Sequence, residues 1–139
     1  NDATGGDIVL FVTSAGEPYV TDVTTFQPGQ VVLNISLRDI GPEIILNSYN
    51  IFDDVEHCMK ASTSPHLAEQ MTGNRDFVTG TIAEVSTGRV AIKHDKPIIY
   101  SPFGLGVLDL VLAREIYQEA LDKGTAITIP NFFGEAARW

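Results

Sequence analysis

Short runs of apolar residues recur along the chain, separated by turns rich in glycine, proline and small polar residues. Four of them, at residues 8–13, 31–36, 50–53 and 98–101, contain mostly β-branched, leucine or aromatic side chains. Continuous runs of this length are typical of strands covered on both faces, as in parallel sheets. We therefore predict strands at these positions and one more short strand at residues 126–129.

Helical spacing of apolar residues marks other segments. Residues 107–123 are predicted to form a long helix that ends before Gly124, with one apolar stripe made of Val107, Leu108, Val111, Leu112, Ile116 and Ala120. The spacing of Phe77, Ile82 and Val85 predicts a second helix over residues 77–88. Residues 42–47 have room for a helical turn or two, and the polar segment 54–70 is expected to be partly helical.

This alternation of strands and helices indicates an α/β fold with a mostly parallel sheet. Ligands of such sheets gather outside the carboxyl ends of the strands, so Thr13, Ser36 and Ser101 are expected at one common edge. Nucleotide-binding sheets normally begin with a glycine-rich turn and have an acidic residue about 20 residues further on. The sequence has neither, and its one G-x-G, Gly104 and Gly106, fits a strand-to-helix turn better than a phosphate loop.

Composition narrows the class of protein. The 139 residues suit one hydrophobic core, and 44% apolar against 19% charged residues excludes a disordered chain. A net charge of −9 argues against nucleic acid as a partner. The single cysteine, Cys58, and three scattered histidines offer no metal site and no disulfide. No apolar run approaches the roughly 20 residues that span a bilayer, and we expect no membrane partner and a cytoplasmic location.

Two acids, Asp53 and Asp54, follow the third predicted strand. Paired acids at strand ends also form the phosphoacceptor site of receiver domains, which we consider as an alternative. That site needs the acids at the first strand and a lysine at the end of the last one, where this chain has Ser101.

Three segments resemble a known family: LNISLRDIGPE (residues 33–43), DDVEHCMKASTSPHLAEQ (53–70) and SPFGLGVLDL (101–110). Together they are similar to the ornithine cyclodeaminase/µ-crystallin superfamily, and within it to the branch that makes 2,3-diaminopropionate. The resemblance covers nearly all of this chain and only the C-terminal part of the family's longer chain. It implies that residues 1–103 form the C-terminal half of a Rossmann-like NAD-binding domain. Residues 104–139 would then be a long helix and tail that return toward a missing N-terminal domain for dimerisation and substrate binding.

The resemblance also implies roles for individual residues. Asp39 matches the aspartate that the cyclodeaminases use as an acid/base, although the surrounding motif differs; otherwise it caps or turns the chain before Pro42. The strand-end residues Thr13, Ser14 and Ala15, with Ser36, match positions beside the cofactor's ribose and nicotinamide, and Ser101 and Gly104 match positions facing the nicotinamide. An ordinary turn and a helix cap would use the same residue types. Arg38 is a candidate for binding a substrate carboxylate, or else a surface arginine.

The function implied is an NAD-dependent dehydrogenase that oxidises and hydrolyses N-(2-amino-2-carboxyethyl)-L-glutamate to 2,3-diaminopropionate and 2-oxoglutarate, for siderophore or antibiotic synthesis. Ornithine cyclodeaminase, which converts ornithine to proline and ammonia, and a non-catalytic NAD(P)-binding protein like µ-crystallin are the alternatives. The expected partners are an amino-acid substrate, the missing N-terminal part and, in the complete protein, a second subunit. Alone, the 139-residue chain is expected to be inactive, to bind NAD weakly and to self-associate.

Overall fold

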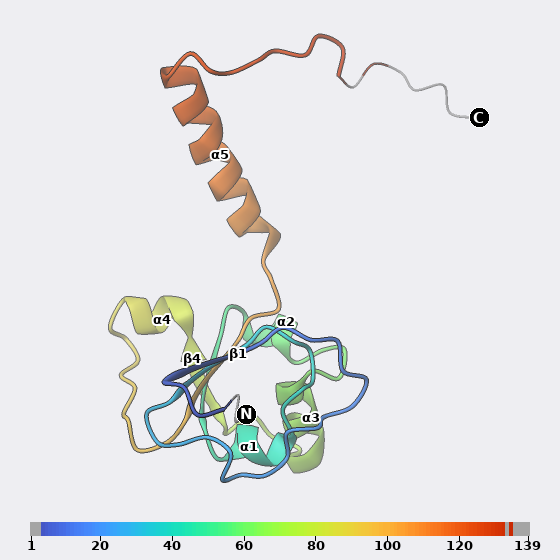
Figure 1. Ribbon diagram of the computed structural model, residues 1–139, viewed down its shortest axis with the longest axis vertical. Helices are drawn as coiled ribbons and strands as arrows, with labels where there is room; N and C mark the ends of the chain where they lie inside the picture. Colours follow the sequence, from blue (N-terminus) through green and yellow to red (C-terminus); the bar gives the residue numbers. More distant parts are fainter. Residues whose placement is uncertain (1–3, 133, 135–139) are drawn as a thin grey trace, which may run out of the picture. The chain divides into compact units, whose positions relative to one another are not determined.

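The structure is a computed structural model that describes residues 4–132 and residue 134 (Figure 1). The chain divides into two compact units, the first ending at Gly104 and the second beginning at Leu105. No helix in the described residues is long and apolar enough to cross a membrane.

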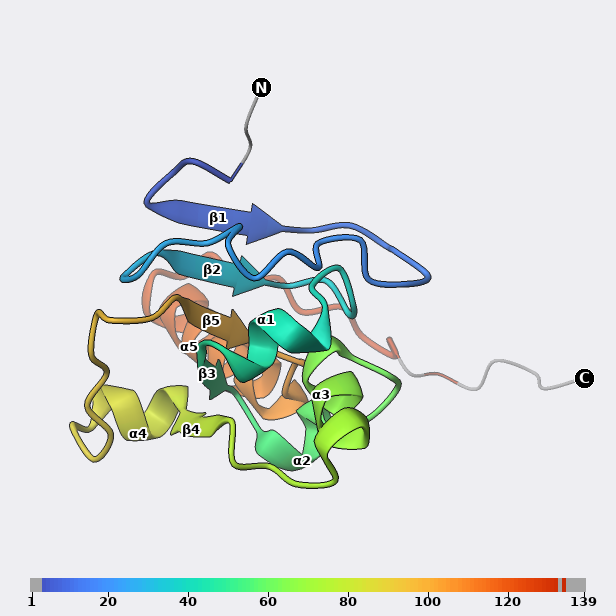
Figure 2. The ribbon, with the colours of Figure 1, turned by 90° about the horizontal axis from the view of Figure 1, so that it is seen from below.

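Five short parallel strands form the sheet of the first unit. They are β1 (Ile8–Phe11), β2 (Val31–Asn34), β3 (Tyr49–Phe52), β4 (Val78–Thr81) and β5 (Ile98–Ser101). Their order is β1-β2-β5-β3-β4, and every neighbouring pair runs parallel (Figure 2). The four strands predicted from the apolar runs are confirmed, although β1 and β2 end at Phe11 and Asn34 rather than at Thr13 and Ser36.

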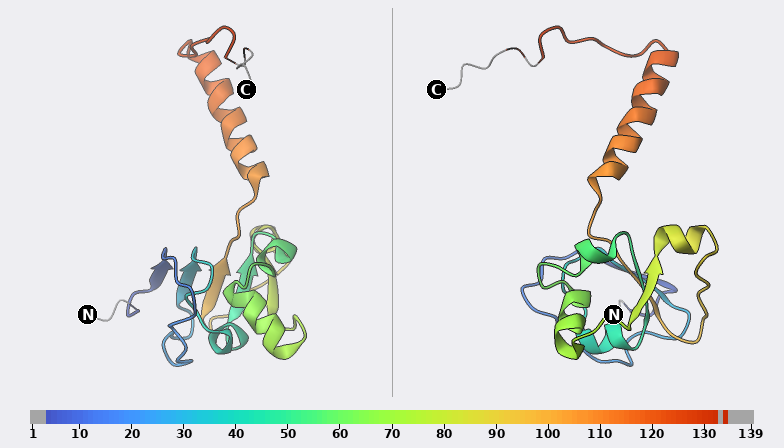
Figure 3. Two further views of the ribbon diagram at one scale, coloured as in Figure 1. Left: turned by 90° about the vertical axis from the view of Figure 1, so that its right-hand side faces the viewer. Right: turned by 180° about the vertical axis from the view of Figure 1, so that it is seen from behind.

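One face of the sheet carries the hydrophobic core. β1 contributes Val9 and Phe11, which are buried, and the central strands contribute Val32, Ile99 and Phe52, which are fully buried. Burying each such side chain contributes about 1.5–3 kcal/mol. The opposite face of β1, which lies at one edge of the sheet (Figure 3), remains open, with its apolar residues about two-thirds exposed.

Three short helices cover the core face: α1 (Pro42–Leu46), α2 (Val55–Cys58) and α3 (Ser64–Thr72). Pro42 occupies the first turn of α1, where its missing N–H is no loss. The Thr63 hydroxyl caps α3 by accepting from the His66 N–H, and Gly73 ends the helix in the left-handed conformation. The helices predicted within residues 42–47 and 54–70 are thereby confirmed.

The helix predicted over residues 77–88 is wrong in its first half. Residues 78–81 form β4 on the free edge of β3, and only α4 (Ile82–Ser86) is helical. The β-branched Val78, Thr79 and Thr81 favour a strand, and Thr81 with Glu84 forms the capping box that starts α4. The apolar spacing that suggested one helix thus spans two elements.

The second unit contains α5 (Gly106–Asp122), which confirms the predicted long helix. None of its residues is buried, and its exposed apolar residues include Val107, Leu108, Val111, Leu112 and Ile116. The strand predicted at residues 126–129 is wrong, because these residues have no regular structure. A strand needs a neighbour for its backbone groups, and the described part of this unit provides none.

Candidate functional site

Three strand ends meet at the carboxyl edge of the sheet. The backbone N–H of Thr13 donates a 2.7 Å hydrogen bond to Ser36 Oγ, and Asn34 Nδ2 donates one of 3.1 Å to Ser101 Oγ. Because β1, β2 and β5 are neighbours in the sheet, these bonds tie together the segments that follow them. The prediction that Thr13, Ser36 and Ser101 share one edge is confirmed.

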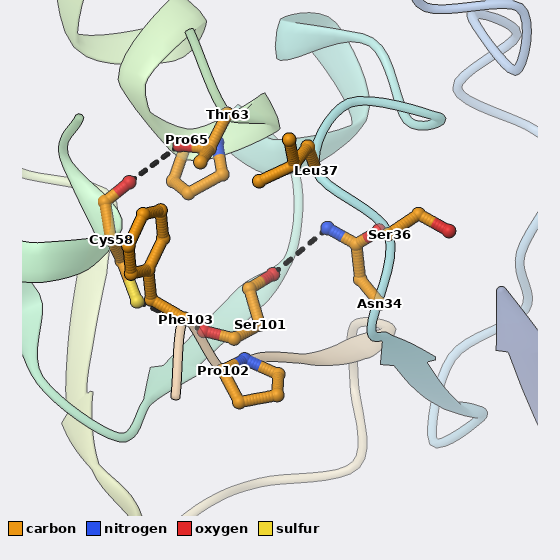
Figure 4. Close-up of a pocket in the computed structure, with 9 residues that line it drawn as sticks. All are labelled: Asn34, Ser36, Leu37, Cys58, Thr63, Pro65, Ser101, Pro102 and Phe103. Atoms are coloured by element: carbon orange, nitrogen blue, oxygen red, sulfur yellow. Dashed lines mark hydrogen bonds between the residues drawn. The ribbon is translucent and has the colours of Figure 1, made fainter. Parts of the chain in front are cut away.

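A small cavity opens at this edge (Figure 4). Its volume is about 10 Å³, which is room for about one water molecule, so a larger ligand enters it only with one small group. The ends of β2 and β5 and the start of α3 supply its walls, which consist of Asn34, Ser36, Leu37, Cys58, Thr63, Pro65, Ser101, Pro102 and Phe103.

Asn34, one of the lining residues, has a buried hydrogen-bond acceptor without a partner. The residue is 1% exposed, and its Oδ1 is buried with no hydrogen bond from any described residue. An unpaired buried acceptor costs about 1–3 kcal/mol. The hydroxyls of Ser36 and Ser101 both serve as acceptors, so their hydrogens remain able to donate to a ligand. The residues that line the cavity therefore include one unpaired amide oxygen and two hydroxyls that are able to donate.

The turn after β5 is held by Asp53, the residue that follows β3. Its carboxylate accepts hydrogen bonds from the backbone N–H of Phe103, at 3.0 and 3.1 Å, and of Gly104, at 2.7 Å. Partial burial raises the pKa of Asp53, but these bonds and one from the Asp54 N–H outweigh it and leave the pKa below its usual value. Asp53 is therefore a carboxylate at neutral pH.

Cys58 joins the same turn from α2. Its thiol lies 3.3 Å from Asp53 Oδ1 and 3.1 Å from the Ser101 carbonyl oxygen. Burial, together with the neighbouring Asp53 carboxylate, raises the pKa of the Cys58 thiol to about 12. The thiol stays protonated, so it acts as a weak donor and not as a nucleophile.

Asp39 lies close to the cavity residues but does not line the cavity. Its side chain is fully buried, and its Oδ2 accepts from the Thr13 hydroxyl at 2.5 Å and from the Tyr19 hydroxyl at 3.2 Å. Its Oδ1 is buried without a partner among the described residues. The Asp39 carbonyl also accepts from the N–H groups of Tyr19 and Val20, so this residue joins two loops as well.

Arg38 reaches toward the loop before α3. Its Nη2 donates a 2.8 Å hydrogen bond to the Ala61 carbonyl, while its Nε is buried without a partner in the described chain. Ala61 and the following Ser62 both have positive φ, 55° and 52°, which strains residues other than glycine. Arg38 therefore supports a strained loop and retains guanidinium donors for an anion.

The remaining predicted site residues lie around this edge without lining the cavity. Ser14 is exposed and Ala15 half-buried in the segment after β1. Gly104 is in the turn held by Asp53, where its φ of 100° suits only glycine. Sequence reasoning missed Asn34, Thr63 and Phe103 as cavity residues. A signal existed for Asn34, because it is a polar residue directly after three apolar ones in a buried strand.

Asp53 and Asp54 do not form a receiver-type acidic pair. They follow β3 rather than β1, and Asp54 caps α2 by accepting from the His57 N–H at 2.8 Å. Among the residues that the structure describes, no group of three or more histidine, cysteine or acidic side chains is placed to hold a metal ion.

Comparison with known proteins gives one curated relative with significant similarity. It is the N-((2S)-2-amino-2-carboxyethyl)-L-glutamate dehydrogenase of Staphylococcus aureus (strain NCTC 8325 / PS 47), 23% identical over 128 residues. The match covers 89% of this chain and 38% of the relative, so this chain spans well under half of the relative's length. No family model matches the chain.

Solved structures share the fold. The Δ1-pyrroline-2-carboxylate reductase of Thermococcus litoralis, solved with NADH and L-proline, superposes with a TM-score of 0.81 at 18% identity, over 91% of this chain and 42% of its own. A probable ornithine cyclodeaminase of Bordetella pertussis Tohama I has a TM-score of 0.70 at 22% identity, over 91% and 43%. These structures confirm the predicted α/β fold with a mostly parallel sheet.

Proposed function

We propose that this chain forms the nicotinamide side of the NAD-binding domain in an NAD-dependent dehydrogenase of the ornithine cyclodeaminase/µ-crystallin superfamily. The observation that carries the proposal is the cavity where β2 and β5 end, since open α/β sheets bind their ligands outside the strands' carboxyl ends. A structure with this fold was solved with NADH, which supports the choice of cofactor.

The residues present fit the nicotinamide end of NAD. A carboxamide offers both an NH₂ donor and a carbonyl acceptor, which complement the orphaned Asn34 Oδ1 and the hydroxyls of Ser36 and Ser101. The cavity admits a group of that kind only at its mouth, so the ring itself would lie outside, against Thr13, Ser14, Ala15 and the Gly104 turn. When bound, NAD supplies the acceptor for a hydride from the substrate carbon.

We propose N-(2-amino-2-carboxyethyl)-L-glutamate as the substrate, following the curated relative. This compound carries several carboxylates, and a guanidinium binds a carboxylate through two parallel hydrogen bonds. Arg38 is the residue proposed for that contact, because within the described chain its guanidinium donates only to the Ala61 carbonyl; a contact through its buried Nε requires the neighbouring loop to shift. Oxidation at the glutamyl α-carbon gives an imine, and water then releases 2,3-diaminopropionate and 2-oxoglutarate.

Asp39 is proposed as the general base that activates this water. Its orphaned Oδ1 supports the role, because a buried carboxylate oxygen without a donor is able to accept a proton. Because the Asp39 side chain is fully buried, the hydroxyls of Thr13 and Tyr19 must shift before water reaches the carboxylate. Tyr19 is more than half exposed, so its ring can turn away without opening the core.

The rest of the nucleotide site is proposed to lie in a further segment of the complete protein. The glycine-rich turn that binds pyrophosphate is missing from these residues, whereas the structure leaves apolar side chains of β1 and of α5 exposed. An N-terminal part that extends the sheet beyond β1 and packs on α5 would supply the turn and cover these side chains, with a second subunit completing a dimer.

Incubation of the complete enzyme with each substrate tests the proposal. Net formation of NADH from N-(2-amino-2-carboxyethyl)-L-glutamate supports it. Proline formation from ornithine without net NADH would instead identify a cyclodeaminase, which the Bordetella pertussis structure makes the second candidate. Nucleotide binding without turnover of either compound would favour a binding protein.

A further inference from the structure

We propose that Asp53 is a positioning residue for the nicotinamide end of the cofactor. It acts by holding the Phe103–Gly104 turn in one conformation, which fixes the wall of the cavity. This inference rests on the proposed function and deepens it, because it assigns a role to an acid that sequence reasoning considered only for a phosphoacceptor site.

The hydrogen bonds of the turn show how completely Asp53 controls it. Pro102 has no N–H, so Phe103 and Gly104 carry the only backbone donors between β5 and residue 105. Both donate to the Asp53 carboxylate, over 2.7–3.1 Å. The Cys58 thiol lies within hydrogen-bond reach of the Ser101 carbonyl on the other side of Pro102. The turn is therefore tied to β3 and α2 along its whole length.

The chain on either side of Asp53 is held firmly in place. It directly follows Phe52, which is fully buried in the core, and its Oδ1 also accepts from the Asp54 N–H at 2.7 Å. The ring of His57 stacks on that of Phe103, with centroids 6.4 Å apart and planes 16° from parallel. The same short segment of chain therefore holds both the backbone and the side chain of the turn.

Neighbouring side chains in the described residues leave the Gly104 end of the turn unconfined. Gly104 has a φ of 100°, and an added Cβ there would touch nothing within 4 Å, so neighbouring side chains do not confine it. Two cavity residues, Pro102 and Phe103, belong to this turn, and a third, Ser101, directly precedes it at the end of β5 (Figure 4). Loss of Asp53 would leave the Phe103 and Gly104 N–H groups to water and let this wall move.

Loss of a positioning residue changes ligand binding, whereas loss of a structural residue changes the stability of the fold. The bonds from Phe103 and Gly104 lie at the surface, where water replaces them at little cost to folding. The shape of the cavity, by contrast, depends on them. Removing Asp53 should therefore weaken contacts to the nicotinamide and leave the rest of the nucleotide site unchanged.

The test measures binding of NADH and of ADP-ribose, which lacks the nicotinamide, to the complete enzyme proposed above. Asp53→Ala should weaken NADH binding by about tenfold or more and leave ADP-ribose binding within about twofold of the wild type. Asp53→Asn, which replaces one of the two accepting oxygens, should lie between. Asp54→Asn is the matched control, because it removes the same charge one residue away and an asparagine still caps α2.

The outcomes separate the two claims. A wild type that binds neither ligand refutes the proposed function. A wild type that binds both, with Asp53 variants that weaken both equally or neither, overturns the positioning role alone. If Asp53→Ala does not fold, Asp53→Asn is judged by the same criteria. If neither variant binds ADP-ribose or melts cooperatively, Asp53 is a structural residue and the inference is wrong.

Discussion

Replacing Asn34 by leucine should stabilise the fold and abolish the proposed cofactor contact. The side chain is buried, donates one hydrogen bond to Ser101 and leaves its Oδ1 unpaired. Leucine has nearly the same shape and removes an unpaired acceptor that costs about 1–3 kcal/mol. The lost bond to Ser101 offsets about 0.5–1.5 kcal/mol of that gain. The expected net effect of Asn34→Leu is a stabilisation of about 1 kcal/mol, with loss of NADH affinity in the complete enzyme.

Asn50 offers a matched control for this substitution. It is as buried as Asn34 and also has an unpaired Oδ1, but the two hydrogens of its Nδ2 are shared among three carbonyl oxygens, those of Ile45 at 2.7 Å, Ser48 at 3.0 Å and Phe77 at 3.1 Å. Both substitutions remove an unpaired Oδ1, so the free energy gained in this way is the same for the two variants and cancels when they are compared. Asn50→Leu loses more hydrogen bonding than Asn34→Leu and leaves more buried carbonyl oxygens without a donor, a difference of about 2 kcal/mol.

Urea denaturation of the 139-residue chain measures both effects. With a slope of about 1–3 kcal/mol per molar urea, the midpoints of Asn34→Leu and Asn50→Leu should differ by about 1 M, on opposite sides of the wild type. Equal destabilisation by both substitutions would refute the reasoning. It would show that Asn34 Oδ1 already has a stabilising partner in the free protein, such as a bound water, and is not kept for a ligand.

Three further predictions follow from the site. Asp39→Asn in the complete enzyme should lower kcat by about 100-fold or more with NADH affinity unchanged, and steady-state rates that stay at the wild-type level would remove Asp39 from the mechanism. Calorimetric titration of the isolated chain with NAD should detect no micromolar binding, because hydrogen bonds of about 0.5–1.5 kcal/mol each do not offset an association cost of at least about 4 kcal/mol. The pKa of Asp53 lies below its usual 3.8 in the folded chain. The ionised carboxylate therefore stabilises the fold above pH 3.8, and this contribution is lost as the pH falls through the folded pKa. Acid titration should destabilise the wild type more than Asp53→Asn, as measured by the free energy of unfolding.

Elements that depend on local composition could be predicted from the sequence. The apolar runs located four strands because buried parallel strands have no polar face, and the stripe from Val107 to Ile116 located α5 because helix periodicity is local. β4 could not be predicted in this way. Its residues include Thr79 and Gly80, and it is a strand because the edge of β3 was free to pair with it.

The candidate site was predictable only in part, for a related reason. Strand-end residues such as Ser36 and Ser101 could be placed at one edge because parallel strands all end on the same side. Contacts that depend on strand order could not be placed. Asp53 meets Gly104 across 51 positions of sequence, and this requires β5 to lie beside β3. The burial of Asp39 likewise depends on where the Tyr19 loop folds back.

The strand order also explains why two neighbouring polar side chains serve different purposes. β5 lies between β2 and β3, so the end of β5 has Asn34 on one side and Asp53 on the other. The Asp53 carboxylate already accepts from three backbone N–H groups and lies beside the Cys58 thiol, which leaves little of it for a ligand. Asn34 makes one bond and keeps an acceptor unpaired. In the proposed site, the side of the cavity toward β2 would therefore recognise the ligand, and the side toward β3 would hold the wall in place.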